Sequence, residues 1–237
     1  MILCFGDSIT QGRPGVTYLK YVRDRREFVN FGLGGDTLAG MTVRLKNAFC
    51  DAKYSNADTV IIGIGTNDVL HPYLRGFSKS WTKIVGRLIG RGSVPCSDET
   101  EFRVRYEELL KMLADTDKKV IIFGIPLLET NVVELNVKAE AYNRIIRELC
   151  GELGVYFIDI MELQSEIKTK LNNHGAKFFS SSILEPVFLT VFTTYLPFTD
   201  QVSKNRGLAV TVDGVHMNTI SAKCLASLVD AAVESLP

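Results

Sequence analysis

The sequence predicts an α/β protein, a three-layer α/β/α sandwich with about five parallel strands. This prediction rests on short apolar runs, rich in Val, Ile or Phe, that alternate with longer segments of helical period. The runs are continuously apolar, which is typical of strands buried on both faces of a parallel sheet. They lie at Ile2–Phe5, Phe28–Leu33, Thr59–Ile64, Val120–Ile125 and Val155–Ile158.

Three helices are predicted most clearly, at Glu101–Ala114, Val133–Leu153 and Thr219–Leu236, because apolar residues recur there at intervals of three and four. In the second helix one apolar stripe is expected to lie on the sheet. Its members are Val137, Ala141, Ile145, Leu149 and Leu153.

The 237 residues are predicted to form a single domain, residues 1–237, with two insertions. The stretches 69–100 and 172–210 are longer than a simple crossover between strands requires. Extra length of this kind is often functional when it lies at the carboxyl end of a strand.

Composition narrows the class of protein. Lys plus Arg and Asp plus Glu number 27 each, so the net charge predicts no nucleic-acid partner. The five cysteines are scattered without C-x-x-C spacing and are expected to be reduced thiols.

Met1 runs directly into the first predicted strand without a secretory signal, so a cytoplasmic protein is expected. The apolar stretch Phe178–Phe198 contains a Glu and two Pro and is not expected to span a membrane.

Ser8 follows the first strand in the sequence Gly6-Asp7-Ser8. This position lies at the carboxyl end of a strand, where open α/β sheets bind their ligands. Taken alone, Ser8 fits the N-cap of a following helix as well as it fits a nucleophile.

Glycines follow the second strand, in Gly34-Gly35-Asp36-Thr37. They predict either a flexible turn before a helix capped by Asp36 or Thr37, or a loop whose Gly35 amide points at an oxyanion beside Ser8. The sequence of this loop does not decide between the two.

Two later segments add polar groups. Asn67, in Gly65-Thr66-Asn67-Asp68 after the third strand, fits a turn former, or a neutral amide that stabilises negative charge. Asp213-Gly-Val-His216 precedes the last helix, and its spacing allows Asp213 to bind one imidazole nitrogen while the other faces Ser8. Alone, His216 would also fit a surface loop.

Together these segments resemble the four sequence blocks of the GDSL-type, or SGNH, hydrolase superfamily. The matching blocks are Gly6-Asp7-Ser8, Gly35, Gly65-Thr66-Asn67-Asp68 and Asp213-Gly-Val-His216, with Ile9 where the family name has Leu. The resemblance covers residues 1–68 and about 120 to the end, and it leaves out both insertions.

The resemblance implies a flavodoxin-like sandwich that carries a serine esterase site. Ser8 would be the nucleophile, His216 the general base and Asp213 the residue that orients it. The oxyanion hole would consist of the Ser8 and Gly35 amides and the Asn67 side chain. Neither a metal nor an organic cofactor is implied.

The function predicted is a cytoplasmic serine esterase or acylhydrolase that cleaves small-molecule carboxylic esters or thioesters through an acyl-enzyme. Its acyl group would be lipid-like or of medium to long chain. One alternative is a deacetylase of acetylated sugars or small metabolites. Another is an inactive binding or scaffold protein, because a fold does not by itself establish activity.

The insertions leave further alternatives open. In the first insertion, basic residues recur every fourth position beside an apolar face. This pattern predicts either a helix packed on the core with a solvated outer face or a cap helix that contacts an anionic lipid surface.

The second insertion predicts an extra buried layer, a homodimer contact or a lid over an acyl pocket. His71 and His174 are interpreted as ordinary loop residues. The regularly spaced basic residues of the first insertion are Arg75, Lys79, Lys83, Arg87 and Arg91.

Overall fold

A computed structural model confirms the predicted fold class. It describes residues 1–171 and 184–236. Five parallel strands form one sheet in the order β2-β1-β3-β4-β5. The strands are β1 (Ile2–Gly6), β2 (Phe28–Gly32), β3 (Thr59–Gly63), β4 (Lys119–Phe123) and β5 (Tyr156–Ile158).

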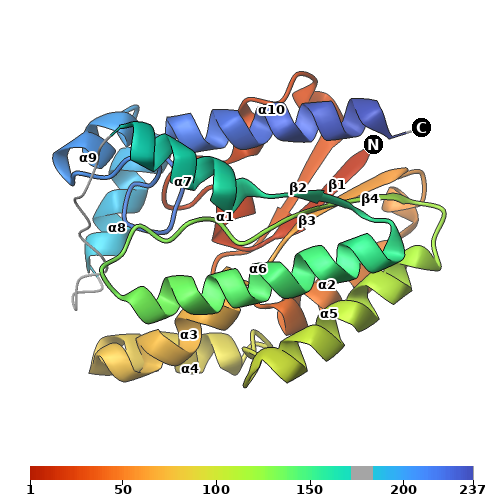
Figure 1. The fold of residues 1–237 in the computed structure, drawn as a ribbon, viewed down its shortest axis with the longest axis horizontal. Helices are drawn as coiled ribbons and strands as arrows, with labels where there is room; N and C mark the ends of the chain where they lie inside the picture. Colours follow the sequence, from red (N-terminus) through yellow and green to blue (C-terminus); the bar gives the residue numbers. More distant parts are fainter. Residues whose placement is uncertain (172–183, 237) are drawn as a thin grey trace.

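Helices cover both faces of the sheet. Figure 1 shows α10 and α7 along one face and α2, α5 and α6 along the other, with α3 and α4 outside the second layer. The helices are α1 (Ser8–Gln11), α2 (Leu38–Phe49), α3 (Thr66–Phe77), α4 (Lys79–Ile89), α5 (Glu99–Ala114), α6 (Val133–Leu153), α7 (Ile160–Lys170), α8 (Leu184–Thr190), α9 (Thr199–Asn205) and α10 (Thr219–Ser235). No helix in the described ranges has the length and apolar character needed to cross a membrane.

The predicted stripe on α6 is correct only in its middle. Ala141, Ile145 and Leu149 are buried, whereas Val137 is 58% exposed and Leu153 is 37% exposed. A helix has 3.6 residues per turn, so a stripe of residues four apart drifts around the helix and its ends leave the buried face. The buried face also includes Leu135, Ala139, Tyr142 and Ile146.

Residues 184–210 of the second insertion lie at the end of the molecule away from both chain termini (Figure 1). The hydroxyl of Thr193 accepts a hydrogen bond from the Gly15 amide at 2.8 Å, so this segment rests on the loop that follows α1. Several of its apolar side chains are exposed and therefore do not form an extra buried layer. They are Phe188, Val191, Phe192, Tyr195, Leu196 and Phe198. His174 lies outside the described residues.

Three glycines lie side by side at the carboxyl edge of the sheet. Gly6 pairs with Gly32 on one side and with Gly63 on the other. A Cβ on Gly32 would lie 2.1 Å from the backbone nitrogen of Gln11, and one on Gly63 would lie 1.8 Å from the ring of Phe123. Side chains at Gly6 or Gly32 would push α1 away from the sheet, whereas one at Gly63 would collide with Phe123 on the neighbouring strand β4. Gly6 and Gly32 therefore set how closely α1, which begins with Ser8, packs against this edge.

The substitution Gly32→Ala tests this close packing. Because its Cβ has no room beside the backbone of α1, we expect the free energy of unfolding to fall by about 1–3 kcal/mol, measured by urea denaturation. Gly86→Ala is the matched control. Gly86 lies within α4 with nothing within 4 Å of the new Cβ, so stability should stay equal or rise by up to about 1 kcal/mol. Equal effects of the two substitutions would contradict the packing argument.

Candidate active site

Ser8, His216 and Asp213 form a continuous hydrogen-bonded chain. The Ser8 Oγ lies 2.9 Å from Nε2 of His216, and Nδ1 of His216 lies 2.7 Å from Oδ2 of Asp213. All three residues are buried. Asp7, rather than Ser8, is the N-cap of α1, because its Oδ1 accepts a hydrogen bond from the Ile9 amide at 2.8 Å. The Ser8 hydroxyl is therefore left to face the imidazole.

Buried charges adjust the protonation of this chain. Burial alone would lower the pKa of His216, but the charge and hydrogen bond of Asp213, together with the charge of Asp7, leave that pKa above its ordinary value. Burial would raise the pKa of Asp213, and the contacts with His216 hold it below its ordinary value. Burial raises the pKa of Asp7 to about 7. The imidazole is thus a stronger base than a free histidine.

The turn from Asp213 to His216 is held by its own carboxylate. Besides bonding the imidazole, Asp213 accepts hydrogen bonds through Oδ1 from the amides of Val215 at 3.0 Å and His216 at 2.8 Å. This geometry fixes the position of the histidine relative to the aspartate. It also gives a physical reason for the three-residue spacing of the two side chains.

Glu129, in the loop that follows β4, anchors the segment that leads into this turn. Its side chain is fully buried, and its Oε1 accepts a hydrogen bond from the Ala209 amide at 2.8 Å. Its Oε2 accepts three more, from the amides of Val210 and Thr211 and from the Thr211 hydroxyl at 2.6 Å. Glu129 is not among the site residues predicted from the sequence. The only signal available was a carboxylate in the loop after a predicted strand.

Asn67 lies beside Ser8, in the first turn of α3. Its Nδ2 donates to the carbonyl oxygen of Asp36 at 2.8 Å and reaches Oδ2 of Asp7 at 3.4 Å. The first contact orients the amide, and the long second contact leaves one N–H weakly engaged. Gly35 has φ of +77°, a left-handed conformation that favours glycine.

The interpretation of Asp36 or Thr37 as the N-cap of α2 is correct in position for Thr37. Thr37 occupies the N-cap position but makes no side-chain cap hydrogen bond. The Leu38 amide at this helix start instead donates to Oδ2 of Asp68 at 3.0 Å. The other oxygen of Asp68 accepts from the Cys96 amide, also at 3.0 Å. Asp68 therefore ties the start of α2 to the loop before α5.

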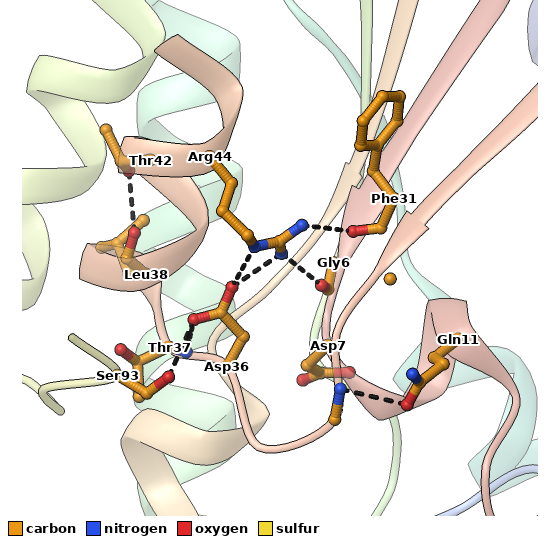
Figure 2. Close-up of polar contacts among 12 residues, drawn as sticks. Gly6, Asp7, Gln11, Phe31, Asp36, Thr37, Leu38, Thr42, Arg44 and Ser93 are labelled. Atoms are coloured by element: carbon orange, nitrogen blue, oxygen red, sulfur yellow. Dashed lines mark hydrogen bonds and ion pairs between the residues drawn. The ribbon is translucent and has the colours of Figure 1, made fainter. Parts of the chain in front are cut away.

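The side chain of Arg44, from α2, fixes the glycine loop to the sheet (Figure 2). Its guanidinium donates to Oδ2 of Asp36 from Nε at 2.8 Å and pairs with the same oxygen from its terminal nitrogen at 2.6 Å. It also donates to the carbonyl oxygens of Phe31 at 2.5 Å and Gly6 at 3.0 Å. One cation thereby joins the ends of β1 and β2 to the segment that carries Gly35.

A pocket of about 280 Å³ opens beside Ser8 and His216. Its walls come largely from the first insertion, through one face of α3 and one face of α4, each with the spacing i, i+3, i+4, i+7. A Cβ on Gly35 would lie 2.7 Å from Leu88, so glycine lets this wall approach the loop. The wall residues are Asn67, Leu70, His71 and Leu74 from α3, and Trp81, Ile84, Val85 and Leu88 from α4.

The basic residues of the first insertion are all exposed. Their arrangement agrees with the first alternative, in which a solvated outer face backs an apolar face packed on the protein. Contact with a lipid surface stays a prediction. The interpretation of His71 as a loop residue is wrong, because it lies within α3 and is 2% exposed.

The substitution Glu129→Gln tests the anchoring of the loop that carries Asp213 and His216. It would replace one acceptor oxygen by a donor that faces another donor, so the free energy of unfolding should fall by about 1–3 kcal/mol. The amides of residues 209–211 should also exchange hydrogen faster. Glu140→Gln, on the exposed side of α6, should change stability by less than about 0.5 kcal/mol. Unchanged exchange at 209–211 would contradict the anchoring role.

Comparison with solved structures finds the same fold over almost the whole chain. An acetyl xylan esterase, AlAXEase, is 21% identical with a TM-score of 0.65, covering 98% of each chain. The lipase/acylhydrolase from Enterococcus faecalis is 17% identical with a TM-score of 0.58, covering 98% of this chain and 94% of that chain. The acetylxylan esterase Axe2 from Geobacillus stearothermophilus is 19% identical with a TM-score of 0.57, covering 100% and 94%.

No curated protein matches the sequence significantly. The model of the GDSL-like Lipase/Acylhydrolase family matches residues 4–182. That match includes part of the strand before Ser8, the glycine loop and the segment that contains Asn67, and it spans more than half of the chain. The protein therefore belongs to the GDSL-like lipase/acylhydrolase family.

Proposed function

We propose that this protein is a carboxylic ester hydrolase that works through an acyl-enzyme on Ser8. The observation that carries the proposal is the 2.9 Å contact between the Ser8 Oγ and Nε2 of His216, continued at 2.7 Å to Asp213. As Oγ attacks the ester carbonyl carbon, its proton passes to Nε2. Asp213 keeps Nδ1 protonated and stabilises the imidazolium that forms.

The rest of the cycle follows from the same groups. The imidazolium returns its proton to the leaving alcohol, and an acyl-Ser8 ester remains. A water molecule then gives a proton to Nε2 and attacks the acyl carbon, which releases the acid and regenerates the hydroxyl. The amides of Ser8 and Gly35 and the Asn67 side chain are the proposed donors to the oxyanion in both steps.

The pocket favours an acyl chain longer than acetyl. An apolar cavity of about 150 Å³ already accepts benzene, and this pocket of about 280 Å³ is lined mainly by apolar side chains. An acetyl group would leave most of that apolar surface in contact with water. We therefore infer esters of medium-length acyl chains as the substrate class.

A deacetylase of acetylated sugars is the second candidate. The specific observation in its favour is the similarity of fold to two acetyl xylan esterases. Identities of 21% and 19% do not carry their substrates over to this chain, and the size of the pocket favours the longer acyl group. The remaining alternative is an inactive scaffold, against which the close approach of Ser8 to a basic imidazole counts.

Hydrolysis of p-nitrophenyl esters from acetate to palmitate tests the proposal. We expect the wild type to have its highest kcat/KM at medium chain length, and Ser8→Ala to lose about 10⁴-fold or more of kcat. Asn67→Ala should lose about 10²–10³-fold, because one oxyanion donor is removed. Activity confined to acetate would favour the deacetylase. Absence of activity, together with absence of a phosphonate adduct on Ser8, would support the scaffold.

The pH dependence of kcat/KM should reveal the charge of Asp7. His216 acts as a base only when neutral, so activity should rise as the pH rises through a pKa above the ordinary value for histidine. Asp7 is ionised mainly above its own pKa of about 7, and its charge raises the pKa of His216. Asp7→Asn removes this charge, so the part of the acidic limb near and above pH 7 should move to lower pH. The amide oxygen of Asn can still cap α1, which keeps the fold intact. A limb that stays in place or moves to higher pH would contradict this role of Asp7.

A further inference from the structure

His71 is a polar side chain in an otherwise apolar stretch of the pocket wall. It lies on α3 between Leu70 and Leu74, both buried, and is itself 2% exposed. Its Nδ1 is enclosed and has no hydrogen-bond partner among the described residues. A buried polar atom without a partner destabilises the protein, and an apolar residue would fill the same space without that cost. The empty site alone therefore gives no reason for a histidine here.

The imidazole of His71 is neutral at physiological pH, because burial lowers its pKa to about 4. A neutral imidazole offers one N–H donor and one acceptor nitrogen. A half-turn of the ring about its last side-chain bond exchanges the enclosed nitrogen with a ring carbon, so the ring can present a nitrogen to the pocket. It is thus suited to an uncharged oxygen on a ligand and poorly suited to a carboxylate.

The position of His71 on α3 sets where that oxygen would lie. Asn67 and His71 are four residues apart on the same helical face, about 6 Å along the axis. If Asn67 binds the ester carbonyl oxygen, the imidazole meets the acyl chain about 6 Å further into the pocket. An extended chain advances about 1.2 Å per bond, so about five bonds separate the carbonyl carbon from this point, which corresponds to the fifth or sixth carbon of the acyl group.

We propose that His71 determines acyl specificity by hydrogen bonding to a ketone or hydroxyl oxygen on the fifth or sixth carbon of the acyl chain. The substrate class is then medium-chain oxoacyl or hydroxyacyl esters rather than plain fatty acyl esters. This inference rests on the proposed ester hydrolysis at Ser8. When substrate is bound, its ketone or hydroxyl oxygen would supply the hydrogen bond that the His71 imidazole lacks in the free protein.

Two matched pairs of p-nitrophenyl esters test the proposal. They are 5-oxohexanoate with 5-methylhexanoate and 6-oxoheptanoate with 6-methylheptanoate, in which a methyl group replaces the ketone oxygen at similar volume. In the wild type, kcat/KM for at least one oxoacyl ester should equal or exceed that for its methyl partner. In His71→Phe the ratio of oxoacyl to methyl ester should fall roughly tenfold, because the buried ketone oxygen loses its donor.

Two further variants separate hydrogen bonding from packing. His71→Gln keeps an N–H donor and should retain part of the preference for the oxoacyl ester. Leu74→Met changes the same face of α3 without altering its polarity, so the ratio should stay at the wild-type value even if both rates change. The melting temperature of His71→Phe should not fall, because no hydrogen bond of the free protein is lost.

The outcomes distinguish this inference from the proposed function. A wild type that hydrolyses all four esters but prefers the methyl partner of both pairs tenfold overturns the role of His71 and leaves the esterase standing. An unchanged ratio in His71→Phe does the same. A wild type that hydrolyses none of these esters, nor any of the plain series, overturns the proposed function and this inference with it.

Discussion

The arrangement of the site depends on the hydrogen bonds and the ion pair made by the guanidinium of Arg44. It binds the carboxylate of Asp36 and the carbonyl oxygens at the ends of β1 and β2. Those two strands lead directly into α1, which begins with Ser8, and into the glycine loop that carries Gly35. The Asp36 carbonyl oxygen also holds the Asn67 amide. One partly buried ion pair therefore sets the spacing of three segments that contribute to one site. Such a pair acts through geometry more than through net stability.

Buried carboxylates repeat this pattern around the site. Asp7 caps α1, Asp68 holds the start of α2, and Glu129 holds the loop that leads to Asp213. Each accepts hydrogen bonds from backbone amides that would otherwise be unsatisfied in a buried loop. Loops at the carboxyl edge of a parallel sheet have no ladder of their own, so side chains supply the acceptors. The precision of the site comes from these acids as much as from the sheet.

The fold class and the residues around Ser8 could be predicted because their signals are local. Each buried strand is a short apolar run, and each sequence block lies within a few residues of a strand end or the last helix. Arg44 and Glu129 could not be predicted, because their roles depend on contacts with segments far away in the chain. His71 was misassigned for a related reason, since nothing local shows that the first insertion forms two helices folded back on the site.

Because α3 and α4 form most of the pocket wall, changes in these two helices could alter the acyl preference of the protein. The groups proposed to take part in the reaction, apart from Asn67, lie on segments that leave the sheet or precede α10. Most of the side chains that line the pocket lie on α3 and α4, within one continuous stretch of chain. In the proposed assignment, the reacting groups and most of the pocket wall are thus encoded in separate parts of the sequence. Exchange of that helical hairpin between relatives, joined just after Asn67, would be a direct route to new acyl preferences on an unaltered catalytic frame.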